Sequence, residues 1–274
     1  TTEFEEEKMN KYFKTILLLI VITSVSGAYF LRAAGAETNI LPSQYLISDS
    51  TDLTASVEKK SSIKDVKVRK FDSTDQLGWS ASFHVISSKK GNILIDPGKY
   101  DKELAEYIKS IGGIDVILIT HGHWDKLRGL DDAIKANPNA AVYVHELDYP
   151  YFQDPVRNCS IEQGFEGITK TKAQTLTEKT YKIAGYTVNV IHTPGHTEGS
   201  SLFYFPNENM LIGGDTIMAG LVGSSKHPGG NENDRQSSIK KFKQLVFPED
   251  MKIYSGHGED TVYAELMKTN IDLK

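Results

Sequence analysis

The chain reads Ile117-Leu118-Ile119-Thr120-His121-Gly122-His123-Trp124-Asp125-Lys126 at the point where an apolar run gives way to polar side chains. The aliphatic residues at its start predict a strand that is buried on both faces. Two histidines and an aspartate then alternate along a turn, so their side chains can point into one pocket. Imidazole and carboxylate groups are ligands that zinc accepts. The stretch therefore predicts a metal site at the end of a strand.

Three further segments place a similar side chain directly after a predicted strand and beside glycine. They are residues 190–197, 211–216 and 253–258, which contribute His196, Asp215 and His257. Glycine lets the backbone approach closely at such points because it has no Cβ atom. Ordinary polar turns do not explain four strand ends of the same kind. The predicted metal ligands are His121, His123, Asp125, His196, Asp215 and His257.

Apolar periodicity predicts strands that alternate with helices along most of the chain. Strands are expected at 83–86, 92–95, 116–119, 140–144, 181–184, 186–192, 200–205, 209–213 and 251–254. Helices are expected at 101–110, 125–136, 234–246 and 260–269. This alternation indicates an α/β layered fold. We expect residues 64–274 to form one domain that carries the predicted metal site and is long enough for a buried core.

The N-terminal part of the sequence differs from the rest. Residues 1–8 are acidic and are interpreted as an extension ahead of Met9. Basic residues, an aliphatic run at 16–22 and Ala34-Gly35-Ala36 then follow the pattern of a secretory signal peptide. The alternative is an uncleaved membrane anchor. We expect residues 1–36 to direct export, so that the protein is secreted or periplasmic, and the Ser-, Thr- and Lys-rich residues 37–63 to be a linker.

Composition excludes several other classes of function. The net charge of the 274-residue chain is −5, and its lysines are scattered among acidic residues, so no nucleic-acid partner is expected. Cys159 is the only cysteine. An internal disulfide and a zinc cluster of several thiolates are therefore excluded.

The motifs resemble those of the metallo-β-lactamase superfamily over about residues 66–270. The resemblance implies a four-layer αββα sandwich with metal at the edge of two sheets. It also implies that Asp96, in Leu94-Ile95-Asp96-Pro97-Gly98, orients the metal-binding loop from behind. Within the superfamily, residues 95–98, 144–146 and 192–197 are most similar to small glyoxalase II-like hydrolases, the hydroxyacylglutathione hydrolase type.

Lys126 departs from the superfamily pattern, which usually has a histidine that holds a second metal at this position. A protonated lysine cannot be a ligand. The second site would keep only Asp125, Asp215 and His257. Either the second metal is weakly bound, or the enzyme uses one metal and the Lys126 ammonium partly replaces the missing cation. We predict zinc at His121, His123 and His196, and leave the second ion open.

The resemblance implies hydrolysis of a thioester or ester by metal-activated hydroxide. Asp125 would orient the hydroxide and accept its proton, and Lys126 would help the metal to stabilise the oxyanion. The expected partner is a small thioester, ester or lactam. A secreted β-lactamase is one alternative. A single-iron member of the superfamily and a non-catalytic member that binds a ligand are the others.

Overall fold

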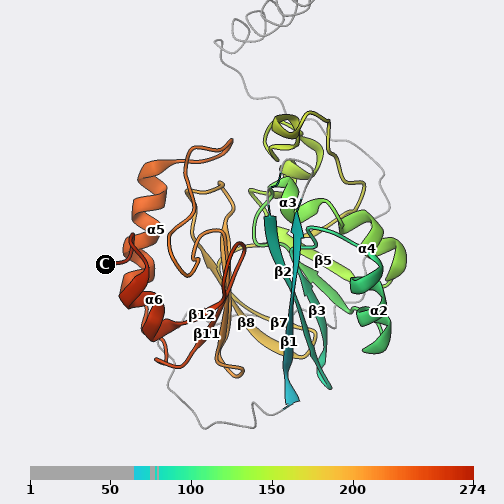
Figure 1. Cartoon of the computed structure of the whole chain (residues 1–274), viewed down its shortest axis with the longest axis horizontal. Helices are drawn as coiled ribbons and strands as arrows, with labels where there is room; N and C mark the ends of the chain where they lie inside the picture. Colours follow the sequence, from blue (N-terminus) through green and yellow to red (C-terminus); the bar gives the residue numbers. More distant parts are fainter. Residues whose placement is uncertain (1–64, 75–77, 79) are drawn as a thin grey trace, which may run out of the picture. The chain divides into compact units, whose positions relative to one another are not determined.

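The computed structural model describes residues 65–74, 78 and 80–274. The predicted export segment at 1–36 and the predicted linker at 37–63 lie outside these residues and stay predictions. In the described part of the chain, no helix has both the length and the apolar character needed to cross a bilayer. The strands of this part form two six-stranded sheets that face each other (Figure 1).

The first sheet has the strand order β1-β2-β3-β4-β5-β6. Its strands are β1 (Lys67–Thr74), β2 (Ser80–Ser88), β3 (Gly91–Ile95), β4 (Val116–Leu118), β5 (Ala141–His145) and β6 (Gln174–Leu176). Strands β3 to β6 are parallel, and β1, β2 and β3 pair antiparallel. Helices α2 (Lys102–Ser110), α3 (Trp124–Leu127) and α4 (Leu130–Ala136) accompany this sheet. Two short 3₁₀ helices, η3 (Tyr149–Gln153) and η4 (Ser160–Gln163), follow β5.

The second sheet has the strand order β12-β11-β10-β9-β8-β7. Its strands are β7 (Thr180–Ile183), β8 (Tyr186–His192), β9 (Ser201–Phe205), β10 (Met210–Gly214), β11 (Lys252–Ser255) and β12 (Thr261–Val262). Pairing is antiparallel except between β10 and β11. Helices α5 (Glu232–Gln244) and α6 (Tyr263–Thr269) cover its outer face (Figure 1).

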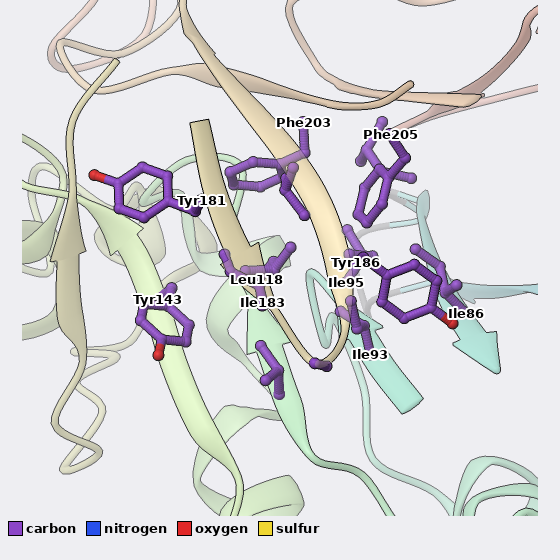
Figure 2. Packing of buried hydrophobic residues seen from close by; sticks show 14 of the residues in the cluster. Ile86, Ile93, Ile95, Leu118, Tyr143, Tyr181, Ile183, Tyr186, Phe203 and Phe205 are labelled. Carbon is purple, nitrogen blue, oxygen red and sulfur yellow. The ribbon is translucent and has the colours of Figure 1, made fainter. Parts of the chain in front are cut away.

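Alternating side chains of the central strands fill two different layers of core. On β3, Ile93 and Ile95 pack between the sheets, whereas Leu94 packs toward the helices. Aromatic side chains such as Tyr186 and Phe203 of the second sheet meet the first sheet in the central layer (Figure 2). Outer layers are buried beneath α2 and α4 on one side and beneath α5 and α6 on the other. The predicted αββα sandwich is therefore confirmed.

The predicted helix at 125–136 is wrong as a single element, because it is interrupted at Arg128 and Gly129 to give α3 and α4. Gly129 donates its backbone N–H to the Pro97 carbonyl at 2.7 Å. A Cβ atom at this position would lie 2.6 Å from the Lys99 carbonyl carbon. The chain after β3 thus passes too close for a side chain at 129.

The sequence did not predict the edge strands β1, β6 and β12. These strands are short or largely exposed, so they show little alternation of apolar and polar residues.

His145 and His192 stack where β5 and β8 end, with ring centroids 4.1 Å apart and an interplanar angle of 9°. Burial, and then the neighbouring His192, lower the pKa of His145 to about 4. Unfolded histidine takes up a proton near pH 6.5. As the pH falls below that value, His145 binds a proton in the unfolded state but stays neutral in the folded state. The free energy of unfolding therefore decreases.

We expect His145→Gln to reduce the part of this decrease that lies between pH 7 and pH 5. Urea unfolding of the wild type and of the variant at both pH values measures it. An equal decrease in the two proteins would show that His145 does not contribute to the acid sensitivity.

Candidate metal centre

The three predicted histidine ligands lie together at one edge of the sandwich. His121 and His123 follow β4, and His196 follows β8. One ring nitrogen from each lies within 4.8 Å of the others, and His123 Nδ1 is 3.0 Å from His196 Nε2. Their exposed fractions are between 1% and 7%, so these are buried polar groups that need partners.

The second nitrogen of each ring is engaged with the surrounding protein. His121 Nδ1 lies 3.1 Å from Thr120 Oγ1, and His196 Nδ1 lies 2.7 Å from the Ser224 carbonyl. His123 Nε2 lies 3.4 Å from the Pro228 carbonyl. Such contacts fix the orientation of metal-binding imidazoles and leave the other nitrogen available to bind.

The donor set fits a metal ion. His121 Nε2 is buried and has no hydrogen-bond partner among the described residues. Burial is the main cause that lowers the pKa of His123 to about 3 and the pKa of His121 well below its ordinary value. These two rings are therefore held ready as neutral donors, which is the form that binds zinc or iron.

The other three predicted ligands also lie together, but a lysine occupies the space between them. Ligand atoms of Asp125, Asp215 and His257 lie within 4.8 Å of one another. Lys126 Nζ lies 2.6 Å from Asp125 Oδ2, 2.9 Å from Asp215 Oδ1 and 3.1 Å from His257 Nε2. Its side chain is fully buried. This set does not fit a second divalent ion while the ammonium is there.

Charge pairing dominates the electrostatics around Lys126. Burial alone would lower the pKa of Lys126, but the Asp125 and Asp215 carboxylates raise it above its ordinary value. Burial would raise the pKa of Asp215, but Lys126 and then His257 hold it well below its usual range. Lys126 and burial lower the pKa of His257. The Asp215 and Asp125 carboxylates outweigh them and raise this pKa to about 9. The ammonium is thus fully charged in the place of a second cation.

Close backbone approach at Gly256 makes this arrangement possible. A Cβ atom at 256 would lie 2.1 Å from Asp215 Oδ1. The Gly256 carbonyl also accepts a hydrogen bond from Lys126 Nζ at 3.3 Å. A side chain at 256 would therefore displace Asp215 from Lys126 and His257.

Asp96 anchors the loop that carries His121. Its carboxylate accepts hydrogen bonds from Thr120 N at 2.7 Å and from Thr120 Oγ1 at 2.6 Å. Because that hydroxyl proton goes to Asp96, Thr120 Oγ1 can accept from His121 Nδ1. Burial raises the pKa of Asp96 to about 7, against the opposing effect of Lys126. Asp96 therefore contacts the metal loop from behind, as the resemblance implied.

Asp148 was not predicted, although it connects two metal-binding loops. Its carboxylate accepts hydrogen bonds from Gly122 N at 2.8 Å and from Thr197 Oγ1 and Gly199 N at 2.6 Å each. Gly122 lies between the first two histidines, and Thr197 follows His196. The one sequence signal was its position shortly after the predicted strand at 140–144.

We expect Asp148→Ala to weaken metal binding by about 10- to 100-fold while every ligand is retained. The reason is that two loops lose their shared acceptor, and the N–H groups of Gly122 and Gly199 lose their partner. A competition titration with a chromophoric chelator measures the dissociation constant. Asp148→Asn, which keeps one acceptor oxygen, is the matched control with a smaller loss. An unchanged affinity for Asp148→Ala would contradict the positioning role.

A cleft of about 290 Å³ opens onto both ligand sets. Trp124, Met218 and Leu221 contribute apolar wall, and Arg128 and Asn158 contribute polar groups. Asp125, Asp215 and His257 also reach this cleft, whereas the fully buried Lys126 does not line it. The cleft is large enough for a small acyl group next to the histidines.

Comparison with known proteins agrees with this geometry. The family model described as Metallo-beta-lactamase superfamily matches residues 78–257. A probable metallo-hydrolase, YqgX of Bacillus subtilis, is 30% identical over 185 residues, which cover 66% of this chain and 86% of that protein. A hydroxyacylglutathione hydrolase of Pseudoalteromonas translucida is 30% identical over 169 residues, which cover 60% of this chain and 54% of that protein.

A solved structure gives the same picture. The crystal structure of BLEG-1 B3 metallo-beta-lactamase superposes with a TM-score of 0.69 at 28% identity, and the match covers 76% of this chain and all of that chain. The region that the family model matches contains all six predicted ligands. This chain belongs to the metallo-β-lactamase superfamily and is a metal-dependent hydrolase.

Proposed function

We propose that the protein is a zinc-dependent hydrolase of a thioester or ester that uses one zinc ion next to a built-in ammonium. The observation that carries this proposal is the place of Lys126 Nζ, within 3.1 Å of all three residues that would otherwise hold a second ion. A zinc ion at His121, His123 and His196 would act as a Lewis acid and lower the pKa of water.

Asp125 is the residue best placed to handle the proton of the attacking water. Its carboxylate is 24% exposed, reaches the cleft and lies 2.6 Å from Lys126 Nζ. In this role it would orient the water and accept its proton, as a weak base, because Lys126 and His257 hold the pKa of Asp125 well below its usual range against the effect of burial. Lys126 is too deeply buried to contact a substrate. We therefore assign it to holding Asp125 and Asp215 and to supplying positive charge at short range.

Two observations support a thioester or ester as the substrate. The cleft joins an apolar wall to a few polar groups, which suits an acyl group with a carbonyl directed at the histidines. The hydroxyacylglutathione hydrolase relative acts on an acylglutathione according to its name. Since this chain spans 54% of that relative, the glutathione part of such a substrate is not carried over.

Hydrolysis of β-lactams is the second candidate. It is favoured by the likeness to BLEG-1, which is a B3 metallo-beta-lactamase. A β-lactam would present its carbonyl to the same histidines and its ring system to the same apolar wall.

Parallel assays with S-lactoylglutathione, a simple aryl ester and nitrocefin test the proposal. We expect the thioester or the ester to be cleaved, the activity to be lost on chelation, and zinc to restore it better than ferrous iron. Nitrocefin cleavage alone would establish the second candidate. Recovery with iron but not zinc would overturn the choice of metal, and no activity with any metal would favour a non-catalytic member.

Export remains a proposal that rests on residues 9–36. Fractionation of cells that produce the full chain, beside a chain lacking residues 9–36, tests it. We expect only the full chain outside the cytoplasm or at the membrane.

A further inference from the structure

A third group of metal-type side chains lies beside the same cleft, which two of its three members line, and it is distinct from the two predicted ligand sets. It consists of Cys159, Glu162 and His227, whose ligand atoms all lie within 4.8 Å of one another. Cys159 immediately precedes η4, and Glu162 lies within that helix. His227 comes from the segment between β10 and α5. Two loops that are far apart in sequence thus contribute to one cluster.

The loop that carries the thiol is held firmly. Asn158 Nδ2 donates to the carbonyls of Tyr151 and Gly167 at 3.0 and 2.7 Å, and Asn158 Oδ1 accepts from Ser160 N at 3.0 Å. The Asn158 carbonyl accepts from Trp124 N at 2.7 Å, which ties this loop to the metal-binding loop. Cys159 itself has a φ of 65°, a left-handed conformation that a residue with a side chain adopts at a cost.

The donor atoms and their spacing suit a borderline-soft dication. A triangle with sides of 4.8 Å has its centre about 2.8 Å from each corner, so an ion at the centre is at most that far from each ligand atom. Zinc bonds to sulfur, nitrogen and oxygen are about 2.0 to 2.3 Å long, and small rotations of Glu162 and His227 would close the difference. Thiolate, imidazole and carboxylate together favour zinc or cobalt over magnesium or calcium.

We propose that Cys159, Glu162 and His227 form an accessory site for zinc or a similar divalent transition metal, which links the two loops at the rim of the cleft.

The position of His227 also bears on this site, and the state of the thiol sets a condition for binding. Burial raises the pKa of the Cys159 thiol to about 12, which works against metal binding, so an ion can bind only if it displaces that proton. The His227 ring centroid lies 5.8 Å from that of His123 and 5.9 Å from that of His196. An ion at the accessory site would therefore hold His227 against the hydrolytic site.

Cobalt titration of the metal-free full chain tests the site with a readout other than activity. Cobalt bound by thiolate gives a sulfur-to-metal charge-transfer absorption in the near ultraviolet, which cobalt bound by histidine lacks. Because Cys159 is the only cysteine, such a band can come from this site alone. We expect two cobalt ions per chain, the charge-transfer band, and release of a proton as the band appears.

Three variants separate the accessory site from the hydrolytic site. Cys159→Ser should lose the band and one equivalent of cobalt, and keep the visible absorption of the histidine-bound ion. Glu162→Gln, an exposed substitution that leaves the core intact, should weaken the band-forming step at least about tenfold. His196→Ala should keep the charge-transfer band and lose the visible absorption of the histidine-bound ion. Loss of the hydrolytic site can therefore be measured separately from loss of the accessory site.

No charge-transfer band at saturating cobalt would overturn the proposal. If Glu162→Gln and His227→Ala both form the band with the cobalt affinity of the wild type, the proposal is also overturned. The thiol would then bind cobalt without the other two ligands. Circular dichroism of each variant checks that it is folded.

Discussion

Replacing Lys126 by methionine is expected to destabilise the metal-free protein by about 3–5 kcal/mol, the range for removal of one partner from a buried ion pair. The Lys126 ammonium lies between two carboxylates and is fully buried. Methionine has a similar length and no charge, so Asp125 and Asp215 would face each other without a cation. Urea unfolding of chelator-treated wild type and variant measures the loss.

Lys135→Met is the matched control, because Lys135 is an exposed residue in the last turn of α4. We expect its stability to stay within about 0.5 kcal/mol of the wild type. Zinc should restore part of the stability of Lys126→Met, since Asp125, Asp215 and His257 are then open to a cation and binding stabilises the folded state. A loss no larger than that of the control would show that the ammonium is not what balances these carboxylates.

Lys126→His tests the same position through metal content. In the Cys159→Ser background, where the accessory site is absent, we expect one zinc per chain when Lys126 is retained and two when Lys126→His is added. The introduced imidazole would complete a ligand set with Asp125, Asp215 and His257. One zinc in both proteins would contradict the idea that the ammonium excludes the second ion.

The second large effect is expected for His196→Ala, which should lower kcat/KM on the cleaved ester or thioester by about a thousandfold or more. A bound metal supplies several kcal/mol of transition-state stabilisation, and about 4 kcal/mol corresponds to a thousandfold in rate. His196 is one of three buried rings whose nitrogens lie close together, and its own ring is held by the Ser224 carbonyl at 2.7 Å. Steady-state kinetics and metal content per chain measure the effect together.

His192→Ala is the control, since this histidine lies only four residues earlier and belongs to neither ligand set. Its Nε2 lies 2.9 Å from the Glu198 carbonyl, and its ring stacks on His145. We expect its kcat/KM to match that of the wild type. A large loss in His192→Ala, or full activity in His196→Ala, would contradict the assignment of the ligands.

The positions of the predicted ligands could be inferred from the sequence, because apolar runs show where strands end. Apolar runs such as Ile117-Leu118-Ile119 mark strands buried on both faces, and the structure places them in adjacent layers of core. A side chain that follows such a strand beside glycine lies at the sheet edge. Four strand ends therefore predicted that His121, His196, Asp215 and His257 lie at one edge of the sandwich. This prediction needed no tertiary contacts.

The role of Lys126 could not be predicted in the same way. The sequence shows that it is a poor ligand, but it does not show where a flexible four-carbon side chain places its charge. Only the tertiary structure shows that Nζ lies among Asp125, Asp215 and His257. The role of Asp148 could not be predicted for a related reason. Its three hydrogen-bond partners belong to loops that are distant in sequence.

The positive charge of Lys126 is covalently attached to the chain. A metal ion leaves when it is diluted, exchanged or removed by a chelator, whereas an ammonium on a side chain stays at full occupancy. Asp125 and Asp215 therefore keep their counter-charge whatever the metal supply, and we expect the two carboxylates to stay in place in the metal-free protein. With the single metal ion that we propose, surroundings poor in transition metals would remove one ion from the reaction centre, whereas a two-metal centre would lose two.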